Sequence, residues 1–173
     1  MSTNETILEV KEHQTYFFSR RCVTKAVDGI SFSFRQGETL GIVGESGCGK
    51  TVSALSILRL LPEPPAEISS GKILFDGQDL LSLNAKALQD LRGRSISMIF
   101  QDPMTSLNPV LTVGEQIAET LLRHTTMNRQ EALQKSADLL RRVELPSPKE
   151  KHYPHQLSGG MRQRVMIAMA LAC

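Results

Sequence analysis

The sequence has no long apolar run, an odd number of cysteines and little excess charge. No apolar run approaches the ~20 residues that span a bilayer, so we expect no membrane crossing. The N-terminus, Met1 to Glu9, is polar and lacks the apolar segment of a signal peptide. The cysteines, Cys22, Cys48 and Cys173, lack metal-ligand spacing and are typical of thiols in a reducing compartment. We therefore expect a cytoplasmic protein whose membrane association, if any, comes through a partner.

The charge and size of the chain are ordinary. A formal net charge of +2 is too small to indicate a nucleic-acid partner, and short basic clusters such as Arg20-Arg21 are typical of a solvated face. The 173 residues, with 40% hydrophobic and 22% charged, suffice for one soluble domain with a core. No internal repeat or low-complexity stretch is present.

The first hundred residues carry strand patterns. Thr39–Val43 is a short apolar run that ends before Gly44, a pattern typical of a buried strand. Asp76-Gly77 is a strong hairpin-turn signal. Beside Thr39–Val43, the expected strands are 7–10, 30–34, 71–75 and 96–100.

Helical patterns follow the first strands and dominate the second part. One helix is expected after Lys50-Thr51, ending before Pro62, and a short one over Asn84–Leu91 with Asn84 as its cap. Two amphipathic helices and a last helix starting near Ser158 should follow. The amphipathic helices span 112–122 and 129–143, with inner faces at Ile117, Leu121, Leu133, Ala137 and Leu140. We therefore divide the chain into an α/β core, 1–100, and a helical part, 101–173.

A glycine-rich motif lies between the expected strand 39–43 and a helix. Gly44-Glu45-Ser46-Gly47-Cys48-Gly49-Lys50-Thr51 matches G-x-x-x-x-G-K-[ST]. Its glycines let consecutive N–H groups point at a phosphate, and the helix start adds partial positive charge. Lys50 would contact the β- and γ-phosphates, and Thr51 would offer its hydroxyl to Mg²⁺. The alternative is a glycine-rich turn with an incidental lysine, which the strand and helix context disfavours.

A second candidate anion site lies near the C-terminal end. Ser158, Gly159 and Gly160 form a helix cap that leaves bare N–H groups at the positive helix end. The alternative is an ordinary N-cap with a flexible lead-in. The stretch Leu157-Ser158-Gly159-Gly160-Met161-Arg162-Gln163-Arg164 resembles the signature motif of ABC ATPases. This resemblance covers the chain from Ile7 onward.

The resemblance implies a site shared between two subunits. The signature loop of one subunit meets the ATP held by the phosphate loop of another, so Ser158, Gly159 and Gly160 would contact the γ-phosphate in trans, with Gln163 close behind. Gln101, expected at the end of a strand, resembles the glutamine of the Q-loop that reaches Mg²⁺ and the attacking water. The stretch 100–109 around it resembles that of the importer branch for dipeptides, oligopeptides, nickel and glutathione. Residues 152–156 and 161–172 fit the same branch.

The only aromatic cluster is Tyr16, Phe17 and Phe18. ABC ATPases stack adenine on an aromatic residue about this far before the phosphate loop, and stacking contributes ~1–3 kcal/mol. Counting from Leu8, we favour Phe17 for this role. The alternative is a strand residue packed in the core.

The resemblance also implies the fold, cofactors and partners. We expect an α/β P-loop NTPase fold of the ABC ATPase type, with N-terminal antiparallel strands and an α-helical subdomain. Within 1–173 this fold would be incomplete at its C-terminus. The cofactors would be ATP and Mg²⁺, with Lys50 and Gln101 as catalytic residues. The partners would be a second ATPase subunit, identical or not, integral-membrane permease subunits and, indirectly, a solute-binding protein. The protein would then lie peripherally at the cytoplasmic face of the cell (inner) membrane.

In family members, the signature helix is followed by an apolar strand that ends in an Asp-Glu pair, the magnesium-holding aspartate and the catalytic glutamate. A switch histidine lies further on. We expect neither the Asp-Glu pair nor the switch histidine within residues 1–173. Hydrolysis by this chain alone is therefore expected to be poor.

The resemblance implies the ATP-binding subunit of an ABC importer, which would couple ATP binding and hydrolysis to the transport of dipeptides or oligopeptides, with nickel or glutathione also possible. The alternatives are a soluble ABC ATPase of another role and a non-catalytic truncated regulator. Against the soluble alternative, the sequence shows no coiled-coil pattern, zinc spacing or strongly basic surface. The transported substrate and homo- versus heterodimerisation stay open.

Overall fold

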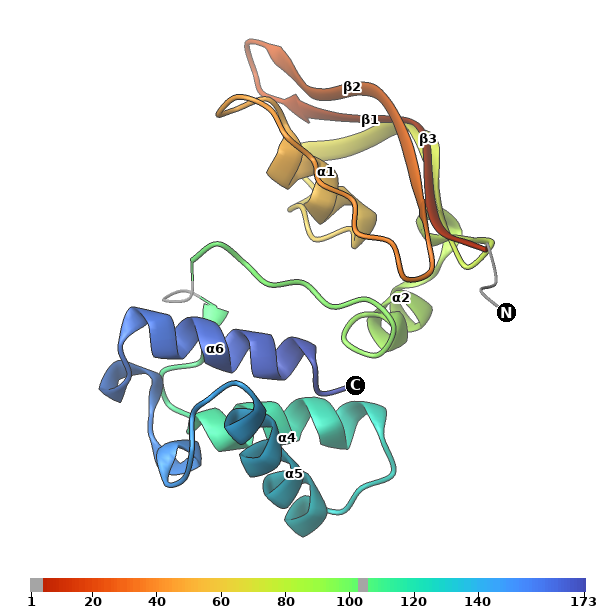
Figure 1. The fold of residues 1–173 in the computed structure, drawn as a ribbon. Helices are drawn as coiled ribbons and strands as arrows, with labels where there is room; N and C mark the ends of the chain where they lie inside the picture. The colour runs from red at the N-terminus through yellow and green to blue at the C-terminus, as the bar shows by residue number, and fades with distance from the viewer. Residues whose placement is uncertain (1–4, 103–105) are drawn as a thin grey trace. The chain divides into compact units, whose positions relative to one another are not determined.

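A computed structural model describes residues 5–102 and 106–173. The chain forms two compact units, Met1–Leu88 and Gln89–Cys173. The first unit carries the sheet and the phosphate-loop motif, and the second carries most of the helices (Figure 1). The division into 1–100 and 101–173, which followed the expected strands and helices, stays a prediction.

The first unit is built on a four-stranded antiparallel sheet of order β2-β1-β3-β4. Its strands are β1 (Thr6–Phe18), β2 (Val23–Arg35), β3 (Ala66–Phe75) and β4 (Gln78–Asp79). The expected strands 7–10, 30–34 and 71–75 are confirmed, and all are longer than expected. The expected turn at Asp76-Gly77 joins β3 to β4.

Helix α1 (Lys50–Ile57) packs against β1 and β2 (Figure 1). Strand β1 alternates buried Leu8 and Val10 with more exposed neighbours, as a sheet with one covered face requires. The register shifts after Val10, where Glu12 has φ 45°, and His13 and Thr15 are buried beyond this bulge. Because of the bulge, the buried residues past Val10 fall on odd positions instead of even ones.

A short 3₁₀ turn, Leu80–Ser82, and α2 (Ala85–Leu91) follow the sheet. The Asn84 side chain accepts a hydrogen bond from the Ala87 amide at 2.9 Å, which confirms Asn84 as the cap of this helix.

Two expected strands are wrong. Residues 39–43 and 97–100 form no strand, and Ile96 makes only an isolated bridge with Arg92. Val43 is 93% exposed, and Ile99 and Phe100 are also exposed. A buried strand needs hydrogen-bonded neighbours on its edges, and none of the strands in the described residues pairs with either segment.

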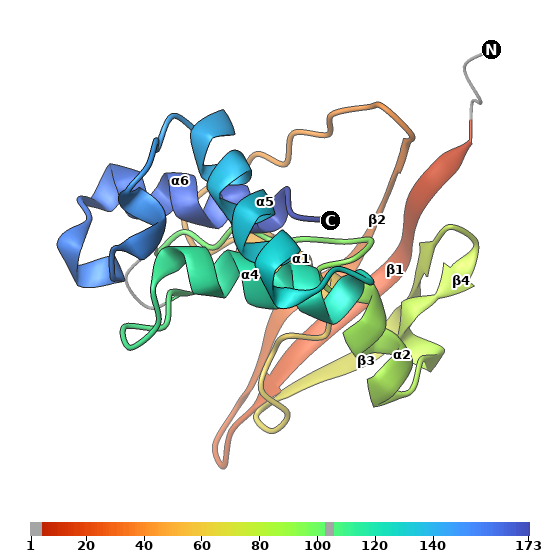
Figure 2. The ribbon, with the colours of Figure 1, turned by 90° about the horizontal axis from the view of Figure 1, so that it is seen from below.

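The second unit contains α4 (Val113–His124), α5 (Arg129–Arg142) and α6 (Gly159–Ala170), with 3₁₀ turns at Lys149–Lys151 and Pro154–Gln156. The three helices pack together in both ribbon views (Figures 1 and 2). Thr112 forms a capping box with Glu115, and Asn128 forms one with Glu131. Each reciprocal bond satisfies amide groups that a helix start would otherwise leave unpaired, so these side chains define where the helices begin.

The helical core buries Ile117, Leu121 and Leu140, as expected. Leu133 was expected on the inner face of its helix but is 38% exposed, so this expectation is wrong. Helix α5 instead buries the stripe Ala132, Ser136, Leu139 and Leu140, whose spacing follows the helix period. Leu133 lies at the margin of this stripe and lines a shallow groove with Leu122.

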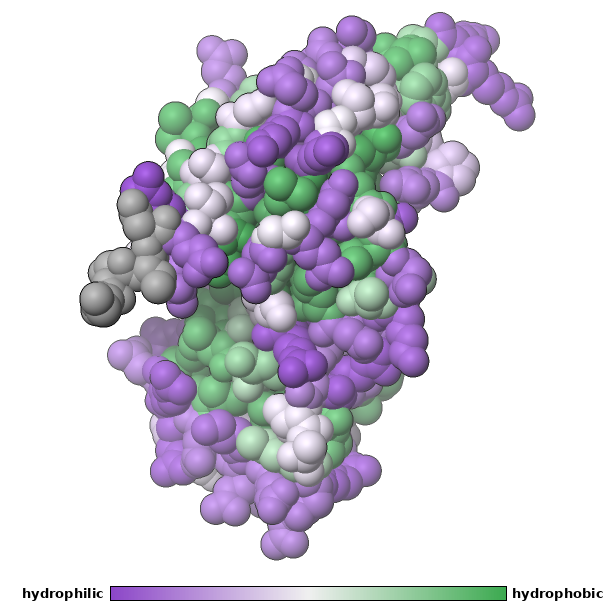
Figure 3. Space-filling model, turned by 90° about the vertical axis from the view of Figure 1, so that its right-hand side faces the viewer, coloured by the Kyte–Doolittle hydropathy of each residue, from purple (hydrophilic) through white to green (hydrophobic). Residues whose placement is uncertain are grey.

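Apolar side chains also reach the surface. On the face drawn in Figure 3, hydrophobic residues lie among hydrophilic ones. Within residues 5–102 and 106–173, no helix is both long enough and apolar enough to cross a membrane.

Candidate nucleotide-binding site

The phosphate-loop motif forms an exposed loop that leads directly into α1. Gly49 precedes the helix in a left-handed conformation, with φ 94°, and no side chain caps the helix. The first helical backbone bond joins the Ser53 amide to the Gly49 carbonyl at 2.8 Å. The amides of Lys50, Thr51 and Val52 therefore precede the hydrogen-bonded ladder, as at any helix start. Such a helix start favours an anion through its amides and its partial positive charge.

Gly49 is required at its position for two reasons. Its positive φ strains any residue with a side chain. A Cβ there would also lie 2.3 Å from the Ala26 carbonyl oxygen and 3.5 Å from Val27 of β2. The end of the loop is therefore pressed directly against the backbone of β2, which fixes where the helix begins.

Lys50 is turned toward its own loop. Its Nζ donates to the Gly44 carbonyl at 2.7 Å and to the Glu45 carbonyl at 2.6 Å, and it lies 3.5 Å from Cys48 Sγ. A phosphate oxygen could replace either carbonyl without moving the backbone, since the ammonium group has three rotatable donors. The lysine is thus already at the loop where a phosphate would be bound.

The predicted residues of the phosphate loop are brought together in this one turn. Glu45, Ser46, Gly47, Cys48 and Thr51 are all exposed on it. Gly47 also has a positive φ, of 84°. In the described residues, no group of three or more His, Cys, Asp or Glu side chains could hold a metal ion by itself. A Mg²⁺ ion here would take most of its ligands from phosphate oxygens and water, with the Thr51 hydroxyl as one protein ligand.

Phe17 lies in β1, opposite Thr24 of β2 and Ala66 of β3, and is half-buried. Its neighbours differ from it. Tyr16 donates a 2.6 Å hydrogen bond to Asp28 and lies under the Lys25 ammonium group, whereas Phe18 is 43% exposed at the strand end. The alternation of the strand separates Phe17 from both. Its adenine-binding role stays a prediction.

Ser158 caps α6 as predicted. Its Oγ accepts a hydrogen bond from the Met161 amide at 3.4 Å, and Ser158, Gly159, Gly160 and Gln163 are all exposed. A Cβ at Gly159 or Gly160 would meet nothing within 4 Å. Packing within residues 5–102 and 106–173 therefore gives no reason for glycine at either position. Close approach by something outside the chain would give one.

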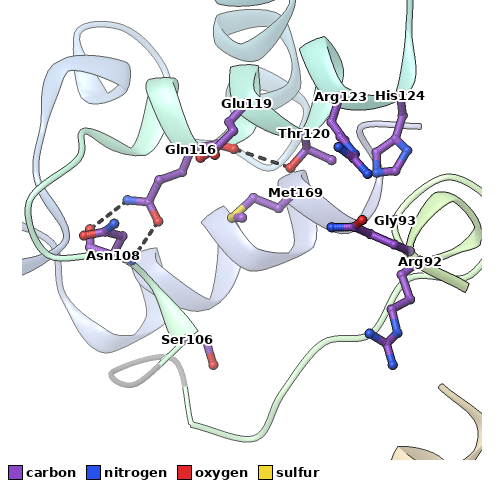
Figure 4. A pocket seen from close by; sticks show the side chains of 11 residues that line it. Arg92, Gly93, Ser106, Asn108, Gln116, Glu119, Thr120, Arg123, His124 and Met169 are labelled. Atoms are coloured by element: carbon purple, nitrogen blue, oxygen red, sulfur yellow. Dashed lines mark hydrogen bonds between the residues drawn. The ribbon is translucent and has the colours of Figure 1, made fainter. Parts of the chain in front are cut away.

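Gln101 is exposed and does not follow a strand, so the structural part of that expectation is wrong, and its role stays a prediction. Pro103, Met104 and Thr105 of the same stretch lie outside the described residues. The stretch is fixed further along by Gln116 of α4, which is 5% exposed. Its side chain accepts from the Asn108 amide at 2.9 Å and donates to the Asn108 carbonyl at 3.0 Å (Figure 4). It also donates to the Leu111 carbonyl at 3.0 Å.

Gln116 and Asn108 line a shallow pocket of about 620 Å³ within the second unit. Arg123, His124 and Met169 point into it from α4 and α6 (Figure 4). Arg123 is 3.5 Å from Asp90, so its charge is partly compensated. This pocket was not expected from the sequence, because it depends on how α4 and α6 pack.

An exposed glycine-rich loop that cradles anions at a helix start, with a lysine folded into it, defines a phosphate-loop nucleotide-binding domain. The particular family follows from comparison with known proteins. The ABC transporter family matches residues 27–173, and the chain belongs to it.

Curated relatives resemble nearly the whole chain. The probable peptide ABC transporter ATP-binding protein y4tR of Sinorhizobium fredii is 52% identical over 171 residues, which are 98% of this chain and 51% of the relative. The dipeptide transport ATP-binding protein DppD of Bacillus subtilis is 50% identical over 171 residues, again 98% and 51% of the two chains. The chain thus spans about half the length of the curated relatives it matches.

A solved structure has the same fold. The dimeric post-hydrolysis state of the ATP-binding cassette MJ0796, bound to ADP and Pi, superposes with a TM-score of 0.85 at 28% identity. The match covers 95% of this chain and 69% of the cassette. The predicted fold class, a phosphate-loop α/β core with antiparallel strands and a helical part, is confirmed.

Proposed function

We propose that this chain is the nucleotide-binding part of the ATPase subunit of an ABC importer for dipeptides or oligopeptides. The observation that carries the proposal is the loop Gly44–Thr51, with Lys50 folded into it at the uncapped start of α1. The cargo class is supported by relatives that are 49–52% identical to this chain. Their names specify peptide, dipeptide and oligopeptide transport. Nickel and glutathione belong to the same branch and are the competing cargoes.

In this proposal, the loop amides and Lys50 bind the phosphates of ATP, and Thr51 is a ligand of the accompanying Mg²⁺. Bound Mg²⁺ would offset negative charge on the phosphate oxygens. Phe17 stacks on the adenine, and Gln101 contacts the metal and the attacking water. The chain's own residues therefore bind and orient the nucleotide, chiefly by positioning and charge stabilisation.

The proposed site is completed by a second subunit. Ser158, Gly159, Gly160 and Gln163 would close over the ATP held by the partner's loop. The unhindered surroundings of both glycines support this arrangement, because a phosphate could approach their amides directly. The dimer would work at the cytoplasmic face of the membrane, where it would couple nucleotide binding and hydrolysis to permease subunits.

Replacing Lys50 tests the nucleotide site. The Lys50→Ala variant should bind Mg-ATP at least about tenfold more weakly, because charge-assisted hydrogen bonds to the phosphates are lost. Isothermal titration calorimetry on the 173-residue chain measures this. Lys86→Ala, which removes an exposed lysine from α2, is the matched control and should bind as the wild type does. Unchanged affinity in the Lys50 variant would exclude the phosphate-loop assignment.

A further inference from the structure

A chain of buried hydrogen bonds joins β1 to α1 inside the first unit. Thr15 Oγ1 lies 2.9 Å from His13 Nε2 and 3.0 Å from Ser56 Oγ. Ser56 Oγ in turn donates to the Val52 carbonyl of its own helix at 2.8 Å. Thr15 and Ser56 are fully buried, and His13 is 1% exposed. Neither the motif nor the resemblance drew attention to these side chains.

The Val52 carbonyl, at the end of this series of hydrogen bonds, determines the donor and the acceptor of every bond in it. A carbonyl can only accept, so Ser56 uses its single proton on Val52 and must accept from Thr15. Thr15 then has no proton left for His13 and must accept from Nε2. Nε2 of His13 therefore carries a proton. Its buried Nδ1 has no hydrogen-bond partner among residues 5–102 and 106–173, which favours the neutral ring with Nδ1 unprotonated.

The hydrogen-bond chain connects two elements with different parts in the proposed site. Ser56 belongs to α1, whose first residues close the phosphate loop. Thr15 lies two residues before Phe17 on β1, and the regular pairing of both with β3 places their side chains on the same face of the sheet.

A second contact links the same elements through β2. Val27, which Gly49 approaches at the end of the loop, is the cross-strand partner of Thr15. The phosphate loop and the strand of Phe17 are thus held at two neighbouring points. One is a backbone contact that only glycine permits. The other is the hydrogen bond between the buried side chains of Thr15 and Ser56.

We propose that Thr15, with His13 and Ser56, is a positioning residue that sets the span between the adenine-stacking Phe17 and the phosphate loop. This rests on the proposed function of that loop and of Phe17. A directional hydrogen bond fixes the position of a helix along a strand, whereas apolar contacts are non-directional and allow the helix to shift. A ligand bound at both ends, a nucleoside triphosphate, benefits from this restraint. A ligand bound only at the loop, an inorganic polyphosphate, does not.

Comparison of two ligands in hydroxyl-deleted variants tests the proposal. Thr15→Val keeps the shape of the side chain and removes its hydroxyl. Its affinity for Mg-ATP should fall about three- to tenfold, the usual effect of one lost hydrogen bond, while its affinity for Mg-tripolyphosphate should stay within about twofold. Thr15→Ser keeps the hydroxyl and should restore ATP affinity. Thr6→Val, at the exposed start of the same strand, is the matched control.

Circular dichroism confirms folding before titration. If Thr15→Val does not fold, Ser56→Ala breaks the same bond from the helix side and should show the same split between the ligands. Equal losses for both ligands, or no loss for either, would overturn the proposal and make the hydrogen-bond chain a purely structural feature. Failure of the proposed function itself would look different, since the wild type would then bind neither ligand.

Discussion

His13 is a buried residue whose protonation affects the stability of the fold. Burial lowers the pKa of His13 below its ordinary value of 6.5, because a charged imidazole would lose its hydration. Protonation would also add an N–H at Nδ1, an atom for which the described part of the chain offers no hydrogen-bond partner. At pH values between the two pKa values, the unfolded chain therefore takes up a proton that the folded chain does not.

This difference gives a prediction with a definite sign. The unfolded chain binds more protons below pH 6.5, so the stability that neutral His13 contributes is complete above that pH and falls as pH drops below it. His13→Leu should remove this loss, so its free energy of unfolding should decline less than that of the wild type between about pH 7.5 and about pH 5.5. Urea denaturation at several pH values measures the difference.

The exposed His155 provides the control for this experiment. His155→Gln should leave the pH dependence of the wild type unchanged. If His13→Leu and the wild type lost stability in parallel as pH fell, His13 would not be the neutral buried group described above.

Among the elements, α4 has a double role in the second unit. Its apolar face forms the helical core, while Gln116 on the same helix holds the backbone of the segment that follows Gln101. Backbone groups need hydrogen-bond partners, and a side chain provides them here through part-buried bonds, where a neighbouring strand would provide them in a sheet. The Gln116 side chain therefore supplies this irregular segment with the hydrogen bonds that a neighbouring strand would supply in a sheet.

Gln116→Leu keeps the approximate size of the side chain and removes all three bonds. It should lower the free energy of unfolding by about 1–3 kcal/mol, because three part-buried hydrogen bonds are lost. Chemical denaturation measures the change. Gln134→Leu, on the exposed face of α5, is the matched substitution and should change stability by less than about 0.5 kcal/mol. Equal effects at the two positions would contradict the bracing role of Gln116.

At the scale of the whole molecule, the proposed catalytic unit is larger than one chain. Ser158→Tyr places a bulky group at the exposed start of α6, and it should leave Mg-ATP binding to the single subunit within about twofold of the wild type. ATP hydrolysis, measured on a protein of the relatives' full length, should fall at least about tenfold because the partner's nucleotide can no longer be closed over. Loss of binding in the isolated subunit would place Ser158 in its own subunit's site instead.

The sequence predicted the local features whose causes are local. Asn84 and Ser158 cap helices as expected, because a short polar side chain can bond to amides only two or three residues away. The phosphate loop was predictable for the same reason. Its glycines, its lysine and the helix after it are contiguous in the chain, and together they carry the binding chemistry.

Features that depend on distant neighbours were decided by tertiary structure. Residues 39–43 read as a buried strand, yet a strand exists only when another strand pairs with it. The exposure of Leu133 reflects which side of α5 meets α4 and α6, a choice that one marginal residue cannot reveal. The bond from Thr15 to Ser56 joins residues 41 positions apart, and no spacing rule connects them. The sequence alone thus predicted which ligand the loop would bind, and only the packing of β1, β2 and α1 decided what holds that loop in place.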